Sequence, residues 1–229
     1  MPLCGEEKKM TIHIQKYIEI VDFLKSKATL VAVSKTKSIP DIHGLYELGQ
    51  KDFGENYVKE LVEKEKVLPK DINWHFIGHL QSNKVKYIAS FVHLIHSVDS
   101  YSLLKEINKQ GARNNRVINC LLQVHIAKEE TKFGLEEHEL ADLIKSIHSD
   151  KEKLKNISVI GLMGMASFSD NKDLIRTEFA QLGTLYQQYP QFRILSMGMS
   201  SDYTIALEEG SNMVRIGSLL FGERNEPAF

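Results

Sequence analysis

The stretch Ala28-Thr-Leu-Val-Ala-Val-Ser-Lys-Thr-Lys37 predicts a buried β-strand that runs directly into a lysine. Residues 29–34 are apolar and rich in β-branched side chains, and breakers follow soon after, as is typical of a strand buried on both faces. Because side chains alternate along a strand, Val31, Val33 and Lys35 should share one face. A strand of this kind belongs to a parallel sheet that is covered by helices.

A lysine on that face would point into protein rather than into water. Burial disfavours the ammonium form, lowers the pKa from about 10.4 and frees a nucleophilic amine. That is the chemistry of a Schiff base, so Lys35 is a candidate for one. Taken alone, the segment leaves open a lysine just beyond the strand that reaches solvent. Lys37 lies further along and is expected to be a solvated or phosphate-steering amine.

Short apolar runs and amphipathic segments alternate along the rest of the chain. An amphipathic helix is expected before the first strand, at 12–25, and one helix after each of the first seven strands. The strands are expected at 29–34, 52–56, 73–78, 91–98, 116–126, 159–165, 192–197 and 212–221. The helices between them are expected at 40–49, 57–66, 82–89, 101–111, 136–149, 170–188 and 202–209.

This repetition predicts an α/β fold with a parallel sheet. Eight strands in about this length favour a closed (β/α)8 barrel of the TIM type, preceded by an N-terminal helix. An open, doubly wound sheet should carry a glycine-rich turn after its first strand, and residues 34–37 are not one. We expect one domain over 1–229, with frayed tails at 1–9 and 225–229.

Composition excludes several classes of function. The chain has 229 residues, 42% of them hydrophobic and 26% charged, with a net charge of −1, which does not suggest a nucleic acid or an anionic membrane as partner. No apolar stretch approaches the roughly 18 residues of a membrane span. Two cysteines without metal or disulfide spacing favour a reducing compartment, so we expect a cytoplasmic protein. Charged side chains cover most helical faces, so we expect a monomer.

Small polar groups follow the last two expected strands. Ser200 or Ser201 could cap the helix that follows strand seven, and Gly217 with Ser218 comes at the expected end of strand eight. Barrels of this class often bind phosphate at these two strand ends. Helix capping alone is the alternative role for Ser200 and Ser201, and close strand packing is the alternative for Gly217. The presence of both features at neighbouring strand ends favours a phosphate site.

Arg215 is harder to explain as a structural residue. By alternation it shares a face with Met213 and Gly217, so it points either into the barrel or into the helix layer. A buried guanidinium needs partners. An inward arginine would favour a functional role, and an outward one an ion pair with a helix.

A buried lysine, a phosphate cradle and a neighbouring arginine fit pyridoxal 5′-phosphate (PLP). Here the sequence resembles the PLP homeostasis proteins, relatives of the barrel domain of alanine racemase, with the blocks in family order from about residue 10 to 224. The matching blocks are Ala32-Val-Ser-Lys-Thr-Lys37, Phe53-Gly-Glu-Asn-Tyr57, Trp74-His-Phe-Ile-Gly-His-Leu-Gln81, Ser196-Met-Gly-Met-Ser-Ser-Asp202 and Val214-Arg-Ile-Gly-Ser218.

The resemblance implies a role for each matching position. Lys35 would hold PLP as an internal aldimine, Asn56 would lie near the cofactor ring, and Arg215 would face the pyridine nitrogen. Ser200, Gly217 and Ser218 would surround the phosphate, with Ser196 and Ser201 close by. The family is thought to buffer, carry or deliver PLP without robust turnover, so the implied partners are PLP and PLP-dependent apo-enzymes.

The main alternative is a PLP-dependent amino-acid racemase or another amino-acid enzyme. Arginine is effectively always protonated, so it would donate to the ring nitrogen and leave that nitrogen unprotonated. The PLP ring should then be a poor electron sink. A base could come from Tyr57, His75 or His79, but we expect the histidines to line the barrel rather than to act as bases or metal ligands. A barrel that binds another phosphorylated metabolite is a third alternative, and it predicts no adduct at Lys35.

Overall fold

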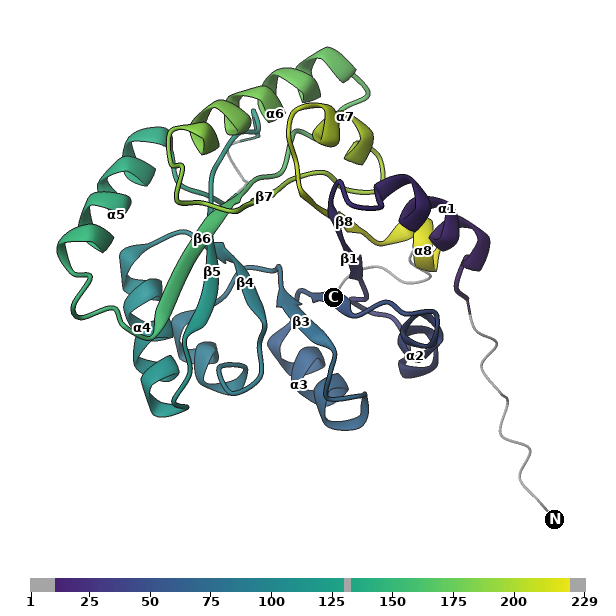
Figure 1. Ribbon diagram of the computed structural model, residues 1–229, viewed down its shortest axis with the longest axis horizontal. Helices are drawn as coiled ribbons and strands as arrows, with labels where there is room; N and C mark the ends of the chain where they lie inside the picture. The colour runs from purple at the N-terminus through teal and green to yellow at the C-terminus, as the bar shows by residue number, and fades with distance from the viewer. Residues whose placement is uncertain (1–10, 130–132, 223–229) are drawn as a thin grey trace.

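Eight parallel strands close into a barrel in the order β1-β2-β3-β4-β5-β6-β7-β8 (Figure 1). The computed structural model describes residues 11–129 and 133–222. The strands are β1 Thr29–Val33, β2 Asp52–Glu55, β3 Asn73–Phe76, β4 Leu94–Val98, β5 Ile118–Gln123, β6 Ile157–Met163, β7 Ile194–Ser196 and β8 Met213–Ile216. This confirms the α/β barrel that the sequence predicts.

Helices surround the strands, as Figure 1 shows most clearly for α4, α5 and α6. The helical elements are α1 Ile14–Leu24, α2 Ile39–Glu47, α3 Val58–Val67, the 3-10 helix η1 Ser82–Tyr87, α4 Tyr101–Arg113, α5 Glu137–Ser149, α6 Lys172–Gln187, α7 Tyr203–Glu208 and α8 Ser218–Phe221. Local signals explain several ends. Ser38 caps α2 by accepting from the N–H of Asp41, and Gly49 follows the helix at φ +98°.

The barrel closes where β8 pairs with β1, and this pairing sets the orientation of the site. Val31 lies opposite Arg215, and Ala32 lies opposite Ile216. Residues paired across parallel strands point to the same side of the sheet. Val31 belongs to an apolar cluster inside the barrel with Leu94, Leu121, Ile160, Met163 and Met213. Arg215 therefore points inward.

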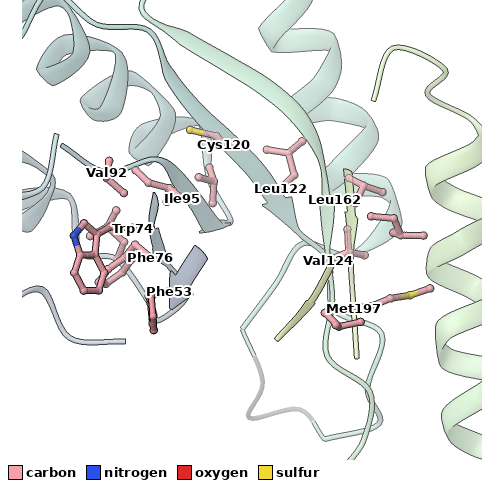
Figure 2. Packing of buried hydrophobic residues seen from close by; sticks show 14 of the residues in the cluster. Phe53, Trp74, Phe76, Val92, Ile95, Cys120, Leu122, Val124, Leu162 and Met197 are labelled. Atoms are coloured by element: carbon pink, nitrogen blue, oxygen red, sulfur yellow. The ribbon is translucent and has the colours of Figure 1, made fainter. Parts of the chain in front are cut away.

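A second and larger apolar cluster lies between the strands and the helices (Figure 2). The aromatic side chains of Phe53, Trp74 and Phe76 meet there, and Leu122 and Leu162 continue the layer around the barrel. Because both faces of the sheet are covered, strands such as β1 read as nearly continuous apolar runs in the sequence, whereas β2 and β3 also carry polar residues.

Several expected boundaries were wrong. The eighth strand was expected over 212–221, but β8 ends at Ile216 and residues 218–221 form the short helix α8. The fourth strand begins at Leu94 rather than at 91, because Phe91 and Val92 close a turn by bonding to the carbonyl of Ile88. The fifth is shorter at both ends, and the helix expected over 82–89 is the 3-10 helix η1.

Two expectations concern the ends of the chain and its relation to membranes. The frayed tails expected at 1–9 and 225–229 lie outside the described residues. Within the described residues, none of the helices has both the length and the apolar character that crossing a bilayer requires.

Candidate functional site

The expected site residues lie around the carboxyl mouth, the end of the barrel where the strands finish and where Lys35, Asn56, Ser200 and Gly217 lie. β1 ends at Val33 rather than at the lysine. Lys35 therefore lies in a tight turn, closed by the N–H of Lys37 donating to the carbonyl of Ser34 at 3.0 Å. The sequence predicts that Lys35 points into protein, and in the structure the residue is half-buried.

A buried ionic cluster that the sequence did not predict binds the backbone of the turn that carries Lys35. Lys64 is only 4% exposed, and its Nζ donates to Glu55 Oε1, Glu60 Oε1 and the carbonyl of Ser34, each at 2.7 Å. Glu60 Oε1 also accepts from the N–H of Thr36 at 2.6 Å. The cluster thus holds the residues on both sides of Lys35.

Glu55 titrates near neutral pH. Burial raises the pKa of its carboxyl to about 7, although Lys64 lowers it, and Glu60 adds to the increase. Its Oε1 accepts from Ser34 Oγ at 2.5 Å, whereas the buried Oε2 has no hydrogen-bond partner among the described residues. Lys64 gave no signal in the sequence because it lies in a charged helical stretch that resembles a solvated face.

Arg215 lies just inside the carboxyl mouth and is 4% exposed. Its Nη1 donates to Ser196 Oγ at 2.6 Å, and its Nη2 donates to the carbonyl of Gly164 at 3.0 Å. Burial lowers the pKa of the guanidinium to about 10, against a smaller effect of Asp202. The group therefore remains a cation and a donor at neutral pH.

The residues expected around a phosphate come together. Ser200 Oγ accepts from the backbone N–H of Gly217 at 3.2 Å, which joins the loop after β7 to the end of β8. A Cβ on Gly217 would lie 3.3 Å from the Cβ and carbonyl oxygen of Val33, so the glycine lies directly against the end of β1. Ser218 is exposed at the first position of α8.

The expected capping role of the serines was wrong. Asp202 is the N-cap residue of α7, and Asp202 Oδ1 accepts from the N–H of Met199 at 2.6 Å. Ser200 is instead turned toward Gly217, and Ser201 is exposed.

Asn56 follows β2 at the same mouth. Its Oδ1 is buried and has no hydrogen-bond partner within the described part of the chain. A buried amide oxygen without a partner costs free energy, which a bound polar group could recover. Gly78 allows its backbone to approach that of Asn56 closely, because a Cβ at position 78 would lie 2.2 Å from the Asn56 carbonyl oxygen.

A polar chain crosses the barrel interior from Arg215 to Asp52. It runs from Arg215 to Ser196 Oγ, then to His96 Nδ1 at 3.2 Å, from His96 Nε2 to His75 Nδ1 at 2.9 Å, and from His75 Nε2 to Asp52 Oδ1 at 2.9 Å. Arginine only donates and an ionised carboxylate only accepts, so the donors point from Arg215 toward Asp52.

The histidines in this chain line the barrel, as the sequence predicts for His75. Burial lowers the pKa of His96 well below its ordinary value, with further contributions from His75, Arg215 and His93, so its ring is neutral. The sequence did not single out His96, because one histidine in an apolar strand carries no signal until the register is known.

The remaining candidates lie elsewhere. Lys37 Nζ donates to the carbonyls of Phe221 and Gly222, at 3.0 and 3.2 Å. Its amine therefore holds the end of α8. His79 stacks on Phe133 with ring centroids 4.5 Å apart, and its Nδ1 lies 3.7 Å from Asp99 Oδ2. Neither arrangement resembles a catalytic base poised over Lys35.

Comparison with known proteins gives matches over almost the whole chain. The family model described as the N-terminal domain of alanine racemase matches residues 14–225. A pyridoxal phosphate homeostasis protein of Aquifex aeolicus is 39% identical over 230 residues, which cover 98% of this chain and 99% of the relative. One from Vibrio alginolyticus is 40% identical, with 86% of each chain covered.

Solved structures agree with these sequence matches. PipY of Synechococcus elongatus, solved without PLP, is 34% identical with a TM-score of 0.81, and the match covers 91% of this chain and 99% of PipY. The structure of PipY with PLP bound gives a TM-score of 0.80 at 33% identity. Alanine racemase from Streptomyces lavendulae shares the fold, with a TM-score of 0.75 at 13% identity over 93% of this chain and 58% of the racemase.

Proposed function

The chain belongs to the pyridoxal phosphate homeostasis protein family, and we propose that it binds PLP at the carboxyl mouth and holds it for use by other proteins. The observation that carries the proposal is that Lys35, in the turn after β1, and Arg215, on β8, lie at the same end of the barrel, because β1 and β8 are paired. A primary amine and a buried cation at one mouth suit an aldehyde that bears a ring nitrogen and a phosphate.

The residues present fit this group. The Lys35 amine would hold the aldehyde carbon through a carbon–nitrogen double bond, with release of water. Asn56 Oδ1, which has no hydrogen-bond partner among the described residues, offers a buried acceptor. Ser200 and Ser218 offer hydroxyl groups for the phosphate, beside the small Gly217. The ionic cluster of Lys64, Glu55 and Glu60 would keep the lysine turn in place.

Arg215 supports a holding role rather than a catalytic one. PLP supplies an electron sink when its ring nitrogen is protonated, which enzymes usually arrange with a carboxylate. Arg215 remains a donor because its lowered pKa of about 10 is still above neutral. The chain therefore offers a donor where a strong electron sink needs an acceptor. Of the histidines considered as bases, His75 is bound between Asp52 and His96 inside the barrel, and His79 stacks on Phe133.

The names of the relatives favour this role over amino-acid turnover. We further propose that PLP-dependent apo-enzymes receive the cofactor. We also propose that the protein is a monomer of one domain and acts in the cytoplasm. The alternative, a racemase or another amino-acid enzyme, predicts exchange of the α-deuterium of a labelled amino acid. A carrier should pass PLP to an apo-enzyme and leave that deuterium in place.

The experiment that tests the proposal is the visible absorbance of the purified protein after PLP is added, before and after borohydride reduction. The wild type should gain an absorbance band, and reduction should fix the cofactor on a peptide containing Lys35. Lys35→Ala should lose both signals. Lys37→Ala is the matched control, because its amine binds main-chain carbonyls of α8, and it should keep the adduct. A wild type that stays colourless, or an adduct that survives in Lys35→Ala, would refute the proposal.

A further inference from the structure

Three potential metal ligands meet at the amino mouth, the end of the barrel where the strands begin and where Asp52 and His93 lie. Asp52 opens β2, His75 lies in β3, and His93 directly precedes β4. One ligand atom from each lies within 4.8 Å of the other two, and among the described residues no other cluster of three such side chains was found. The site is therefore at the opposite end of the strands from Lys35.

The backbone holds these side chains in place. Strands β2 and β3 pair with Asp52 opposite Asn73 and Gly54 opposite His75, and the N–H of His93 donates to the carbonyl of Trp74 at 2.8 Å. His75 is fully buried, and its ring lies 5.3 Å from that of His93 between centroids. Ligands on rigid strands can keep a coordination geometry better than ligands on loops.

The donor set selects a class of ion. Two imidazoles and one carboxylate suit Zn²⁺ and neighbouring divalent transition metals, whereas Mg²⁺ and Ca²⁺ prefer oxygen alone. His75 Nε2 is already 2.9 Å from Asp52 Oδ1, and His93 is exposed, so an ion could enter from solvent. The buried ring of His75 also has an outer partner, because His96 Nε2 lies 2.9 Å from its Nδ1, where a ligating histidine usually has a carboxylate, a carbonyl or water.

We propose that Asp52, His75 and His93 bind one divalent transition-metal ion of the Zn²⁺ class, with water completing the coordination. Metal binding takes the lone pair of His75 Nε2, so the single ring proton moves to Nδ1. From there it donates to His96 Nε2, and the His96 proton moves to Nδ1 and donates to Ser196 Oγ. The hydroxyl hydrogen of Ser196 must then rotate away from His96. No proton is lost, but the donors between His75 and Ser196 now point toward Arg215.

The sequence alone predicts no metal ligand here. Asp52, His75 and His93 lie at spacings that match no metal motif, and only the register of β2, β3 and β4 brings them together. The site uses none of the residues proposed to hold PLP, so it goes beyond the proposed function and can be tested apart from it.

The test is calorimetric titration of the untagged protein with Zn²⁺, together with the visible spectrum of the Co²⁺-substituted form. The wild type should bind one ion per chain at this site. Loss of a residue that merely orients a ligand costs about 10- to 100-fold in affinity, so His93→Ala should weaken binding by at least that much. Because His93 is exposed, this variant should remain folded.

Two further variants separate the explanations. His43→Ala removes an exposed histidine that pairs with a single carboxylate, 3.6 Å away on Glu47, and it should bind Zn²⁺ like the wild type. Lys35→Ala should also bind Zn²⁺ normally, whether or not PLP binds. Equal affinity in the wild type and His93→Ala, no binding by the wild type, or loss of binding in Lys35→Ala would each overturn the proposal.

Discussion

Glu55 and Lys64 form an ion pair of 2.7 Å in which the side chains are 0% and 6% exposed. Removing two charges from water is costly, and their attraction repays this only in part. The pair lies beneath the turn that carries Lys35, because Lys64 also binds the carbonyl of Ser34. Electrostatics in this cluster should therefore affect both stability and the turn of Lys35, the residue proposed to hold PLP.

The first prediction concerns pH. Burial raises the pKa of Glu55 to about 7 from 4.5, so the folded state binds more protons than the unfolded state between these values. The stabilisation is fully present below the unfolded pKa and is lost as the pH rises to the folded one. Relative to Glu55→Gln, the free energy of unfolding of the wild type should fall by about 1–3 kcal/mol from pH 4.5 to 7. Urea denaturation across this range measures it. A constant difference between the two proteins would show that Glu55 does not titrate there.

The second prediction concerns the two hydrogen bonds of Arg215. Arg215→Lys keeps the charge but cannot reach both Ser196 Oγ and the carbonyl of Gly164. It should lower the free energy of unfolding by about 1–3 kcal/mol and should weaken PLP binding. Arg176→Lys is the matched control, because that arginine is exposed beside Glu208 and Glu209, and it should change stability by less than about 0.5 kcal/mol. Equal effects of the two substitutions would contradict the role given to Arg215.

The third prediction concerns Gly78, which lies against the backbone of Asn56. A Cβ in Gly78→Ala would lie 2.2 Å from the Asn56 carbonyl oxygen, so the backbone must shift. We expect a loss of about 2 kcal/mol or more in the free energy of unfolding, and weaker PLP binding. Gly217→Ala, with its nearest atoms at 3.3 Å, should cost less stability. A Gly78→Ala protein with wild-type stability would show that this contact relaxes freely.

The fourth prediction concerns Ser200. Ser200→Ala removes the acceptor of the Gly217 N–H and one hydroxyl beside the expected phosphate. A neutral hydrogen bond is worth about 0.5–1.5 kcal/mol, so PLP affinity should fall by roughly 2- to 12-fold. Fluorescence titration with PLP measures the change, and the exposed Ser201→Ala should leave the affinity unaltered. Unchanged affinity in Ser200→Ala would remove Ser200 from the phosphate site.

Much of the fold could be predicted from the sequence because apolar residues cover the outer face of the sheet and part of its inner face. Residues 30–32 and 120–122 have side chains buried alternately inside and outside the barrel, so both runs are apolar. The segment 218–221 was assigned to a strand for the same reason, because Leu220 and Phe221 are apolar and buried. An apolar run as short as residues 219–221 does not distinguish a strand from a helical turn.

The site was predicted less completely. Lys35, Arg215 and Gly217 carried signals of their own, as a nucleophile, a buried cation and a small residue. The polar chain through His96 and the Lys64 cluster carried none, because their meaning depends on which side chains the register brings together. His96 on β4 and Ser196 on β7 are not on neighbouring strands, and they come into contact only when the barrel closes.

That closure joins the first strand to the last, since β1 completes its pairing only with β8. During synthesis, the segment that carries Lys35 leaves the ribosome long before the segment that carries Arg215. The edge of β1 that pairs with β8 stays unpaired until almost the entire chain has been made. Folding therefore depends on contacts that are distant in sequence. A nascent or truncated chain without β8 should lack the site altogether. Cofactor binding would then report completion of the chain, and free PLP could favour the finished barrel over its partly made precursors.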